Sequence, residues 1–258
     1  MWQRSATVTQ YKRAEARARC ERLRVGGYAD WRMPSAIELV SIVDFDNFNP
    51  SIDAKLFPDT PLDPSTATHT PASYQVTSTT AGDPLAGWLV EFSYGRTSLD
   101  TTSLDRSAYL RCVRGPRAAP ADTSAGRYDL STDGIAVDMK TGLTWQRVSS
   151  ATRRKLADAQ SYCATDTGLP GTGWRVPTIK ELMTLVDFTK PDNYRIDQTV
   201  FTVTTDGVNT YGVFWSATSV AAKPPYAQYD SEIWSVYFDR GANYYIDGAG
   251  YAYIRCVR

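Results

Sequence analysis

The sequence predicts an α+β protein that consists of two tandem copies of one domain. Three observations lead to this prediction. They are an internal repeat with a period near 143 residues, helix-start signals that occur in both copies, and short aromatic strands toward the end of each copy. Each copy has the size of a small domain and is long enough to bury its own core.

The repeat appears as ordered matches at a nearly constant spacing. Trp2-Gln3-Arg4 recurs as Trp145-Gln146-Arg147, 143 residues later. Further blocks match at shifts of 143 to 146: 31–34 with 174–177, 43–45 with 186–188, 88–92 with 234–238, and 109–114 with 253–258. Such small drifts are typical of loop insertions between fixed core elements. We therefore place the first copy at 1–115, a linker with two prolines at 116–125, and the second copy at 126–258.

The second copy begins with a predicted β-hairpin that has no counterpart in the first. Segments 127–130 and 135–138 read as strands, and a Thr141-Gly142 turn leads into Trp145. An upstream stretch of the natural protein or a partner chain is expected to supply the missing strand, because an uncovered sheet edge would otherwise result. No apolar leader follows Met1, which we interpret as an expression start.

Two helices are expected in each copy. Segments 12–24 and 154–164 are equivalent, and the first is rich in Ala, Glu and Arg and contains no Gly or Pro. The second helix follows Ser35 in one copy and Thr178 in the other. Glu38 and Glu181, each three residues further on, complete two capping boxes. Strands are expected at 88–92, 109–113, 213–216, 233–238 and 251–257.

Each copy holds one cysteine in its first helix and one in its last strand. Four cysteines allow three pairings, and the duplication selects Cys20 with Cys112 and Cys163 with Cys256. Two disulfides indicate an oxidising compartment, whereas the alternative is four reduced, buried thiols in a cytosolic protein. No close cysteine pair of the kind that binds zinc is present.

The ordered blocks of the second copy resemble the Lcl C-terminal domain family. They run from 142–146 through Cys163, 173–182, 215–218 and 234–238 to 253–258. The first copy departs from this pattern at its start and matches only weakly at 74–80. The cysteine placement is also similar to the C-type lectin-like fold. The resemblance implies two tandem C-type lectin-like domains, a secreted, periplasmic or cell-surface location, and adhesion through glycans, including sulfated polysaccharides, or through protein partners.

Composition excludes several functional classes. The 28 basic and 28 acidic side chains balance, which argues against a generic nucleic-acid binder. No apolar run approaches the ~20 residues of a transmembrane helix. The single histidine, His69, lies in a turn-rich stretch and leaves no multi-histidine metal site. The loops contain neither calcium-binding triplet of sugar-binding C-type lectins, and the nearest matches are Asn49-Pro50 and 190–193. We expect no cofactor, although an incidental Ca²⁺ ion is compatible with so many oxygen ligands.

Two surfaces are candidate ligand sites. The first combines aromatic and polar side chains near the C-terminus, a composition typical of binding loops. Its members are Tyr229, Asp230, Asp239, Arg240, Asn243, Tyr244 and Tyr245. The alternative is that half of the tyrosines simply pack and the rest belong to a solvated loop.

The second candidate is the basic first helix of the first copy, which suits a polyanion. Its proposed contact residues are Lys12, Arg13, Arg19 and Arg22. The alternative is an ordinary solvated helix with ion pairs four residues apart. The repeated Trp-Arg-x-Pro and Arg-Cys-Val-Arg blocks are interpreted as structural, with their arginines bridging to Asp44 or Asp187.

The function expected from these features is a secreted or cell-surface binding module rather than an enzyme. A hypervariable receptor-binding protein is the first alternative. An enzyme of the sulfatase-modifying fold group is the second. Such enzymes need further reactive cysteines or a His-rich iron site, and this chain has four cysteines and one histidine.

Overall fold

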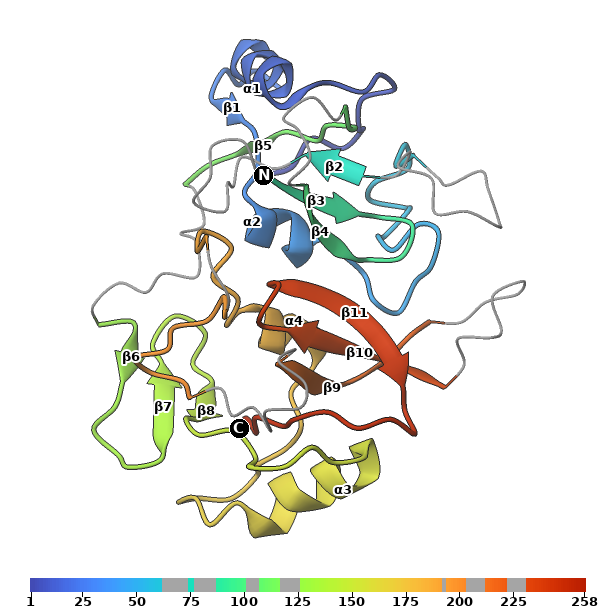
Figure 1. Ribbon diagram of the computed structural model, residues 1–258. Coiled ribbons are helices and arrows are strands. Elements are labelled where there is room, and N and C mark those ends of the chain that lie inside the picture. The colour runs from blue at the N-terminus through green and yellow to red at the C-terminus, as the bar shows by residue number, and fades with distance from the viewer. Residues whose placement is uncertain are drawn as a thin grey trace. The chain divides into compact units, whose positions relative to one another are not determined.

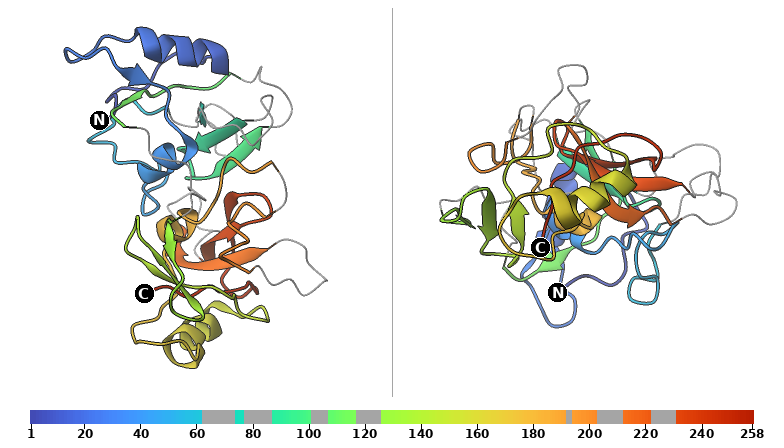
Figure 2. Two further views of the ribbon diagram at one scale, coloured as in Figure 1. Left: turned by 90° about the vertical axis from the view of Figure 1, so that its left-hand side faces the viewer. Right: turned by 90° about the horizontal axis from the view of Figure 1, so that it is seen from below.

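The computed structural model divides into two compact units that mix short helices with antiparallel sheets (Figures 1 and 2). One unit is built mainly on Met1–Pro120, and the other mainly on Ala121–Asp187, Asp192–Val220 and Tyr229–Arg258. The structure describes residues 1–61, 74–76, 87–100, 107–116, 126–191, 194–202, 212–221 and 231–258, with the side chains of 74–76 left out. Within these ranges, no helix is both long and apolar enough to cross a membrane.

The first unit contains α1 (Arg13–Arg22) and α2 (Ala36–Ser41). Its main antiparallel sheet has the order β2-β3-β4. These strands are β2 (Tyr74–Val76), β3 (Gly87–Glu91) and β4 (Thr97–Asp100). The short strands β1 (Trp31–Arg32) and β5 (Val113–Arg114) form a separate antiparallel pair. Trp2 extends this pair through a bridge to Val113.

The second unit opens with an antiparallel sheet in the order β6-β7-β8. These strands are β6 (Tyr128–Asp129), β7 (Ile135–Asp138) and β8 (Thr144–Gln146). They confirm the hairpin predicted at the start of the second copy. Gly142 in the final turn has φ of 74°, a left-handed conformation that favours glycine.

The helices and the second sheet of this unit follow. Helix α3 (Leu156–Ser161) continues into a π-helical turn, Tyr162–Asp166, and α4 (Ile179–Met183) comes next. The sheet then has the order β11-β10-β9. Its strands are β9 (Val213–Ser219), β10 (Glu232–Tyr237) and β11 (Ala242–Asp247).

Both predicted capping boxes are confirmed. The Ser35 hydroxyl accepts from the backbone N–H of Glu38, and the Glu38 carboxylate accepts from the backbone N–H of Ser35 at 2.8 Å. Thr178 and Glu181 make the same exchange at the start of α4. Each box satisfies donors that the first turn of a helix leaves unpaired.

The predicted partner of the repeated Trp-Arg-x-Pro arginines was wrong. Arg32 pairs with Glu38, and Arg175 pairs with Glu181, in place of Asp44 and Asp187. The capping carboxylate already faces the preceding strand, so it lies closer to the arginine than the aspartate after the helix. Asp44 instead accepts hydrogen bonds within its own turn.

Both predicted disulfides are present. Cys20 is bonded to Cys112, and Cys163 is bonded to Cys256, with Cα–Cα distances of 5.6 and 5.5 Å. Each bond lies in the hydrophobic core of its unit. The first core contains Ala16, Trp31, Met33, Leu89, Ala108 and Leu110. The second contains Ile135, Ala159, Trp174, Val176, Trp215, Ile233, Ala252 and Ile254. The first helix of each unit is thereby tied to the last segment of that unit.

Of the strands expected in the later part of each copy, those corresponding to β3, β9 and β10 are confirmed. The segments expected as strands at 109–113 and 251–257 are mostly irregular and contribute isolated bridges, such as Trp145 with Val257. Strands β4 and β11 were missed. Both follow tight turns, and in β11 the polar residues Asn243 and Asp247 resemble loop composition.

Candidate functional site

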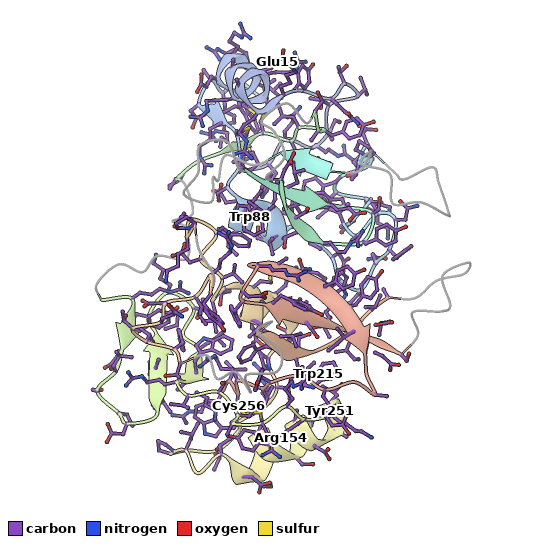
Figure 3. The ribbon with its side chains drawn as sticks, viewed as in Figure 1. Glu15, Trp88, Arg154, Trp215, Tyr251 and Cys256 are labelled. Atoms are coloured by element: carbon purple, nitrogen blue, oxygen red, sulfur yellow. A yellow bond between two sulfur atoms is a disulfide. The ribbon has the colours of Figure 1, made fainter. Side chains whose placement is uncertain are left out.

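Helix α1 exposes a basic surface. Its only fully buried side chains are Ala16 and Cys20, which anchor it to the core of the first unit. The exposed basic residues around and within it are Lys12, Arg17, Arg19, Arg22 and Arg24. Figure 3 shows this helix at the margin of its unit, with Glu15 labelled.

No carboxylate in the described part of the chain forms an ion pair with Arg17, Arg19 or Arg22. The Arg19 guanidinium lies over the Tyr11 ring at 5.2 Å, and Nε of Arg22 donates to the Ala18 carbonyl at 3.1 Å. The ion pairs four residues apart that an ordinary charged helix would form, such as Arg19 with Glu15, are therefore not made. This surface, defined by Lys12, Arg17, Arg19, Arg22 and Arg24, is called the basic surface below.

Arg13 does not belong to the basic surface, contrary to prediction. Its side chain is half-buried, and its guanidinium fills the space that a side chain at position 87 would take, where the protein has Gly87. Burial lowers the pKa of Arg13, and the nearby Asp100 carboxylate offsets part of that change. Arg13 therefore joins α1 to the adjacent sheet and acts as a structural residue.

The equivalent helix of the second unit lacks the basic surface. At the repeat spacing of 143, Arg17, Arg19 and Arg22 correspond to Gln160, Tyr162 and Thr165. Both helices nevertheless bury the same two positions, Ala16 and Cys20 in one and Ala159 and Cys163 in the other. The fold therefore does not require the arginines.

The candidate site near the C-terminus lies on a β-hairpin. Strand β11 pairs with β10, and Gly241 forms the turn between them with φ of 66°. Asn243 and Tyr245 were expected to be exposed, but only 1% and 8% of their surfaces are accessible. The prediction failed because both residues lie on the strand face that packs inward, where Tyr245 contacts Trp234 edge-on at 5.7 Å.

The remaining members of this candidate site have mixed surroundings. Tyr244 is 42% exposed, and its ring stacks on that of Tyr245. Arg240 is exposed, and its Nε lies 3.6 Å from the half-buried Asp239 carboxylate. Burial raises the pKa of Asp239, and Arg240 offsets only part of the rise. Among the described members of this candidate site, the exposed residues are therefore Arg240 and Tyr244.

Two further candidates of that site, Tyr229 and Asp230, lie outside the described residues, as does His69. Tyr251, 55% exposed, lies at the surface of the same unit (Figure 3). In the described ranges, no group of three or more His, Cys, Asp or Glu side chains is arranged to hold a metal ion.

Comparison with known families identifies both halves of the chain. The model of the Lcl C-terminal domain matches residues 1–114 and again residues 134–258. The chain belongs to the Lcl C-terminal domain family. It carries two tandem copies of that domain, as the repeat predicts. No curated protein matches the chain.

Equivalent buried arginines organise the two Lcl C-terminal domains. Nη1 of Arg255 donates to the Gln146 carbonyl at 2.7 Å and to that of Arg147, and Nη2 donates to the Thr202 carbonyl at 2.8 Å. Arg111 donates to the matching carbonyls of the first domain. Burial lowers the pKa of both guanidinium groups. The interpretation of the Arg-Cys-Val-Arg block as structural agrees with these bonds.

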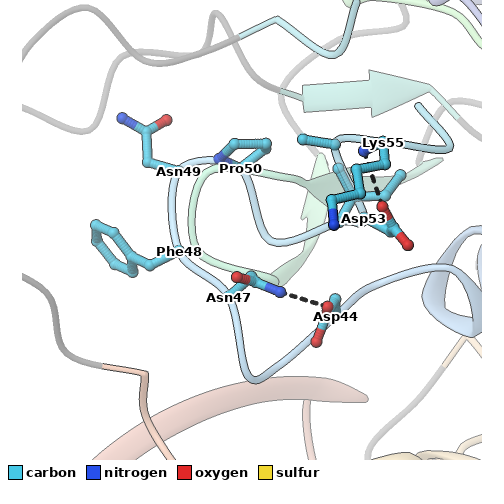
Figure 4. Close-up of a pocket in the computed structure, with 9 residues that line it drawn as sticks. Asp44, Asn47, Phe48, Asn49, Pro50, Asp53 and Lys55 are labelled. Carbon is cyan, nitrogen blue, oxygen red and sulfur yellow. Dashed lines mark hydrogen bonds between the residues drawn. The ribbon is translucent and has the colours of Figure 1, made fainter. Parts of the chain in front are cut away.

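The first Lcl C-terminal domain also contains a pocket of about 500 Å³ in the loop after α2 (Figure 4). Its lining residues include Asp44, Asn47, Phe48, Asn49, Asp53 and Lys55. Asn49 has φ of 40° and precedes Pro50 through a cis peptide bond. Two carboxylates that line the pocket accept local hydrogen bonds. Asp44 accepts from the Asn47 side chain, and Asp53 accepts from the backbone N–H of Lys55.

Sequence reasoning missed this pocket. Asn49-Pro50 was noticed only as a weak match to a calcium-binding triplet. The available signal was the density of Asp and Asn around an aromatic residue within 44–55, a composition suited to hydrogen-bonding and stacking ligands. Sequence alone does not indicate which of these side chains share a cavity.

Proposed function

We propose that this protein is a secreted or cell-surface binding module, adhesin-like and not enzymatic, that recognises acidic glycans through the basic surface of its first domain. We also propose that each domain adopts a C-type lectin-like fold. The helix-to-last-segment disulfide and the antiparallel sheets support this assignment. The two disulfides support an oxidising location.

The observation that carries the proposal is the difference between α1 and α3. The exposed Arg17, Arg19 and Arg22 of α1 form no ion pair with a carboxylate among the described residues, whereas the whole chain is neutral. Two copies of one domain share a buried helix face, yet the second has Gln160, Tyr162 and Thr165 at the positions of Arg17, Arg19 and Arg22. Charge that is not needed for folding and not neutralised locally favours a ligand of opposite sign.

The spacing of the arginines suits a polymer with repeated sulfate or carboxylate groups. Arg19 and Arg22 are three residues apart and are neighbours on the helix surface. Arginine binds such oxyanions with two parallel hydrogen bonds. Because the surface is exposed, salt will screen the interaction over a Debye length of about 8 Å at physiological ionic strength.

The test is retention on immobilised heparin, used as a sulfated polysaccharide probe. The triple variant Arg17→Gln, Arg19→Tyr and Arg22→Thr gives α1 the residues of α3, so the domain is expected to fold. We expect about tenfold weaker affinity near 0.15 M salt, from about 0.5 kcal/mol for each exposed charge. Elution should shift to lower NaCl concentration.

The matched control removes three exposed charges from the second domain with Lys140→Gln, Lys155→Gln and Lys180→Gln. This variant has the same net charge as the triple variant of α1. Equal losses in the two variants would show a non-specific charge effect. Failure of the folded wild-type protein to bind at low salt would contradict the proposal directly.

The pocket at 44–55 favours a second ligand class within the same function. Asp and Asn side chains bind sugar hydroxyls, and an aromatic ring such as Phe48 stacks on a sugar face. We propose that it accepts a neutral sugar unit. Screening of a neutral glycan array, with Phe48→Ala as the loss-of-binding variant, tests this. A wild-type protein that binds only acidic glycans would contradict the second ligand class.

A further inference from the structure

One cation–π pair occurs in both domains with its two residues exchanged. In the first domain, the Arg19 guanidinium lies over the Tyr11 ring, 5.2 Å from the ring centre. At the repeat spacing of 143, these two positions correspond to Tyr162 and Arg154. There, the Arg154 guanidinium lies 4.6 Å from the centre of the Tyr162 ring. The fold therefore accepts the pair in either order.

The order of the pair decides where the positive charge lies. Arg19 is an exposed residue within α1, whereas Arg154 precedes α3 and is only partly exposed. The Tyr162 hydroxyl also accepts a hydrogen bond from Nε2 of Gln146 at 2.8 Å, which an arginine could not accept. The first domain thus places the cation of this pair on the helix surface, and the second domain does not.

The Tyr11 ring is a fixed support for Arg19. Tyr11 packs against the hydrophobic core of the first domain. Its backbone forms an antiparallel bridge with Ala108, in which each residue donates its N–H to the carbonyl of the other, at 2.8 and 3.0 Å. A guanidinium within about 6 Å of an aromatic ring centre is attracted to the ring face. The ring therefore restricts an arginine side chain that would otherwise move freely in solvent.

The hydrogen-bond donors of Arg19 remain accessible to a ligand. Among the described residues, no carboxylate forms an ion pair with Arg19. Glu15, four residues earlier on the helix (Figure 3), accepts instead from the backbone N–H of Lys12 at 3.2 Å. The donors of a guanidinium lie in its own plane, and the Tyr11 ring lies to one side of it. A sulfate or carboxylate group can therefore accept two parallel hydrogen bonds without displacing the ring.

We propose that Arg19 is the specificity-determining residue of the basic surface and that Tyr11 positions it. In this role, Arg19 binds one sulfate or carboxylate group of the glycan through a two-bonded contact. The inference rests on the proposed binding of acidic glycans. Because stacking restricts Arg19 before the ligand arrives, less conformational entropy is lost on binding. Arg17 and Arg22 add attraction that depends mainly on their charge.

Two substitutions of Tyr11 separate the ring from the charges. Tyr11→Phe keeps the aromatic face, whereas Tyr11→Leu removes it and leaves every charge in place. We expect Tyr11→Phe to bind immobilised heparin as the wild type does. Tyr11→Leu should bind about two- to fivefold more weakly near 0.15 M NaCl. NMR of the Arg19 Nε–H group tests the stacking without a ligand, because the ring current should shift this signal in the wild type and in Tyr11→Phe but not in Tyr11→Leu.

A third variant exchanges the two residues, Tyr11→Arg together with Arg19→Tyr. It has the composition and net charge of the wild type and the residue order of the second domain, so it is expected to fold. We expect its affinity for heparin to fall about as far as that of Arg19→Tyr alone.

The outcomes distinguish this inference from the proposed function. Wild-type affinity in the exchanged variant would overturn the role of Arg19 and leave acidic-glycan binding standing. Equal affinities of Tyr11→Phe and Tyr11→Leu, or an Arg19 signal without a ring-current shift in the wild type, would overturn the positioning role of Tyr11. Failure of the folded wild-type protein to bind heparin at low salt would contradict the proposed function, and the ligand contact of Arg19 with it.

Discussion

Arg32 and Glu38 form a two-bonded ion pair that links β1 to the start of α2. Nη1 of Arg32 lies 2.8 Å from Oε2 of Glu38, and Nη2 lies 2.6 Å from Oε1. Oε2 also accepts from the backbone N–H of Ser35. Arg175 and Glu181 repeat the pair at 2.8 and 2.7 Å. One carboxylate in each domain thus serves both as a helix cap and as the partner of the repeated arginine.

The first prediction concerns this double role. Glu38→Gln keeps the cap but removes the charge, and we expect a loss of about 1 kcal/mol in the free energy of unfolding of the first domain. Glu38→Ala removes both the cap and the charge, and it should lower the free energy of unfolding of the first domain by about 2 to 3 kcal/mol. Urea unfolding, with hydrogen exchange to separate the domains, measures both losses. Equal losses in the two variants would show that the cap adds nothing beyond the ion pair.

The second prediction concerns pH. Burial acts to raise the pKa of Glu181, but hydrogen bonds from Arg175 and from the Thr178 backbone outweigh it and hold that pKa below its usual value. The folded protein therefore binds this proton less readily than the unfolded chain. The stabilisation is complete above the unfolded pKa of about 4.3 and is lost as the pH falls through the lower folded pKa. Glu181→Gln should flatten the acid side of the stability curve.

Glu232 provides a control of opposite sign. Burial, followed by the nearby Asp247 carboxylate, raises the pKa of Glu232. The folded protein binds this proton more readily, so ionised Glu232 lowers stability above its raised pKa. Relative to the wild type, Glu232→Gln should therefore raise the free energy of unfolding more at neutral pH than at pH 4. Urea midpoints between pH 7 and pH 3 measure both variants, and parallel curves would contradict the assignment.

The third prediction concerns the buried pair Arg127–Asp138 in the β6–β7 hairpin. Asp138→Asn leaves the Arg127 charge buried without its carboxylate, and we expect a loss of about 3 to 5 kcal/mol in the free energy of unfolding of the second domain. The double variant Arg127→Met and Asp138→Leu removes both charges and should recover most of that loss. A double variant as unstable as Asp138→Asn would show that packing, and not the unpaired charge, dominates.

Much of the fold was predictable because the chain is duplicated. The repeat alone selected the disulfide pairs, and the Ser35 and Thr178 caps depend on contacts only three residues apart. The partners of Arg32 and Arg175 were mispredicted, because sequence does not show which of two nearby carboxylates faces the strand. Strand β11 was missed because its polar residues resemble a turn.

The candidate sites were predicted less well for a related reason. Arg13 and Asn243 are polar residues of types that usually lie at the surface. Tertiary packing nevertheless half-buries Arg13 beside Gly87 and buries Asn243 on the inward face of β11. The exposed arginines Arg19 and Arg22 were found, since a buried stripe at 16 and 20 leaves the opposite positions in solvent. Sequence indicates which residue types suit a ligand, whereas exposure depends on the neighbouring elements.

The fourth prediction concerns the redox state. Alkylation of unreduced, denatured protein should leave Cys20, Cys112, Cys163 and Cys256 unmodified, and mass spectrometry should detect no added groups. Replacing both Cys163 and Cys256 with Ser should cost the second domain about 2 to 5 kcal/mol in the free energy of unfolding. Four alkylated thiols in protein taken from its natural compartment would contradict the proposed secreted location.

The last prediction separates two adjacent tyrosines of β11. Tyr245 is 8% exposed and contacts Trp234, so Tyr245→Ala should leave a cavity and lower the free energy of unfolding by about 3 kcal/mol. Tyr244 is 42% exposed, and Tyr244→Ala should change the free energy of unfolding by no more than about 1 kcal/mol. Because the stacked rings share one strand, both variants have the same change in strand propensity. Denaturant unfolding of the second domain measures the difference. Equal losses would show that Tyr245 is not a core residue, and its role as a ligand contact would then be open to the same glycan-binding assay.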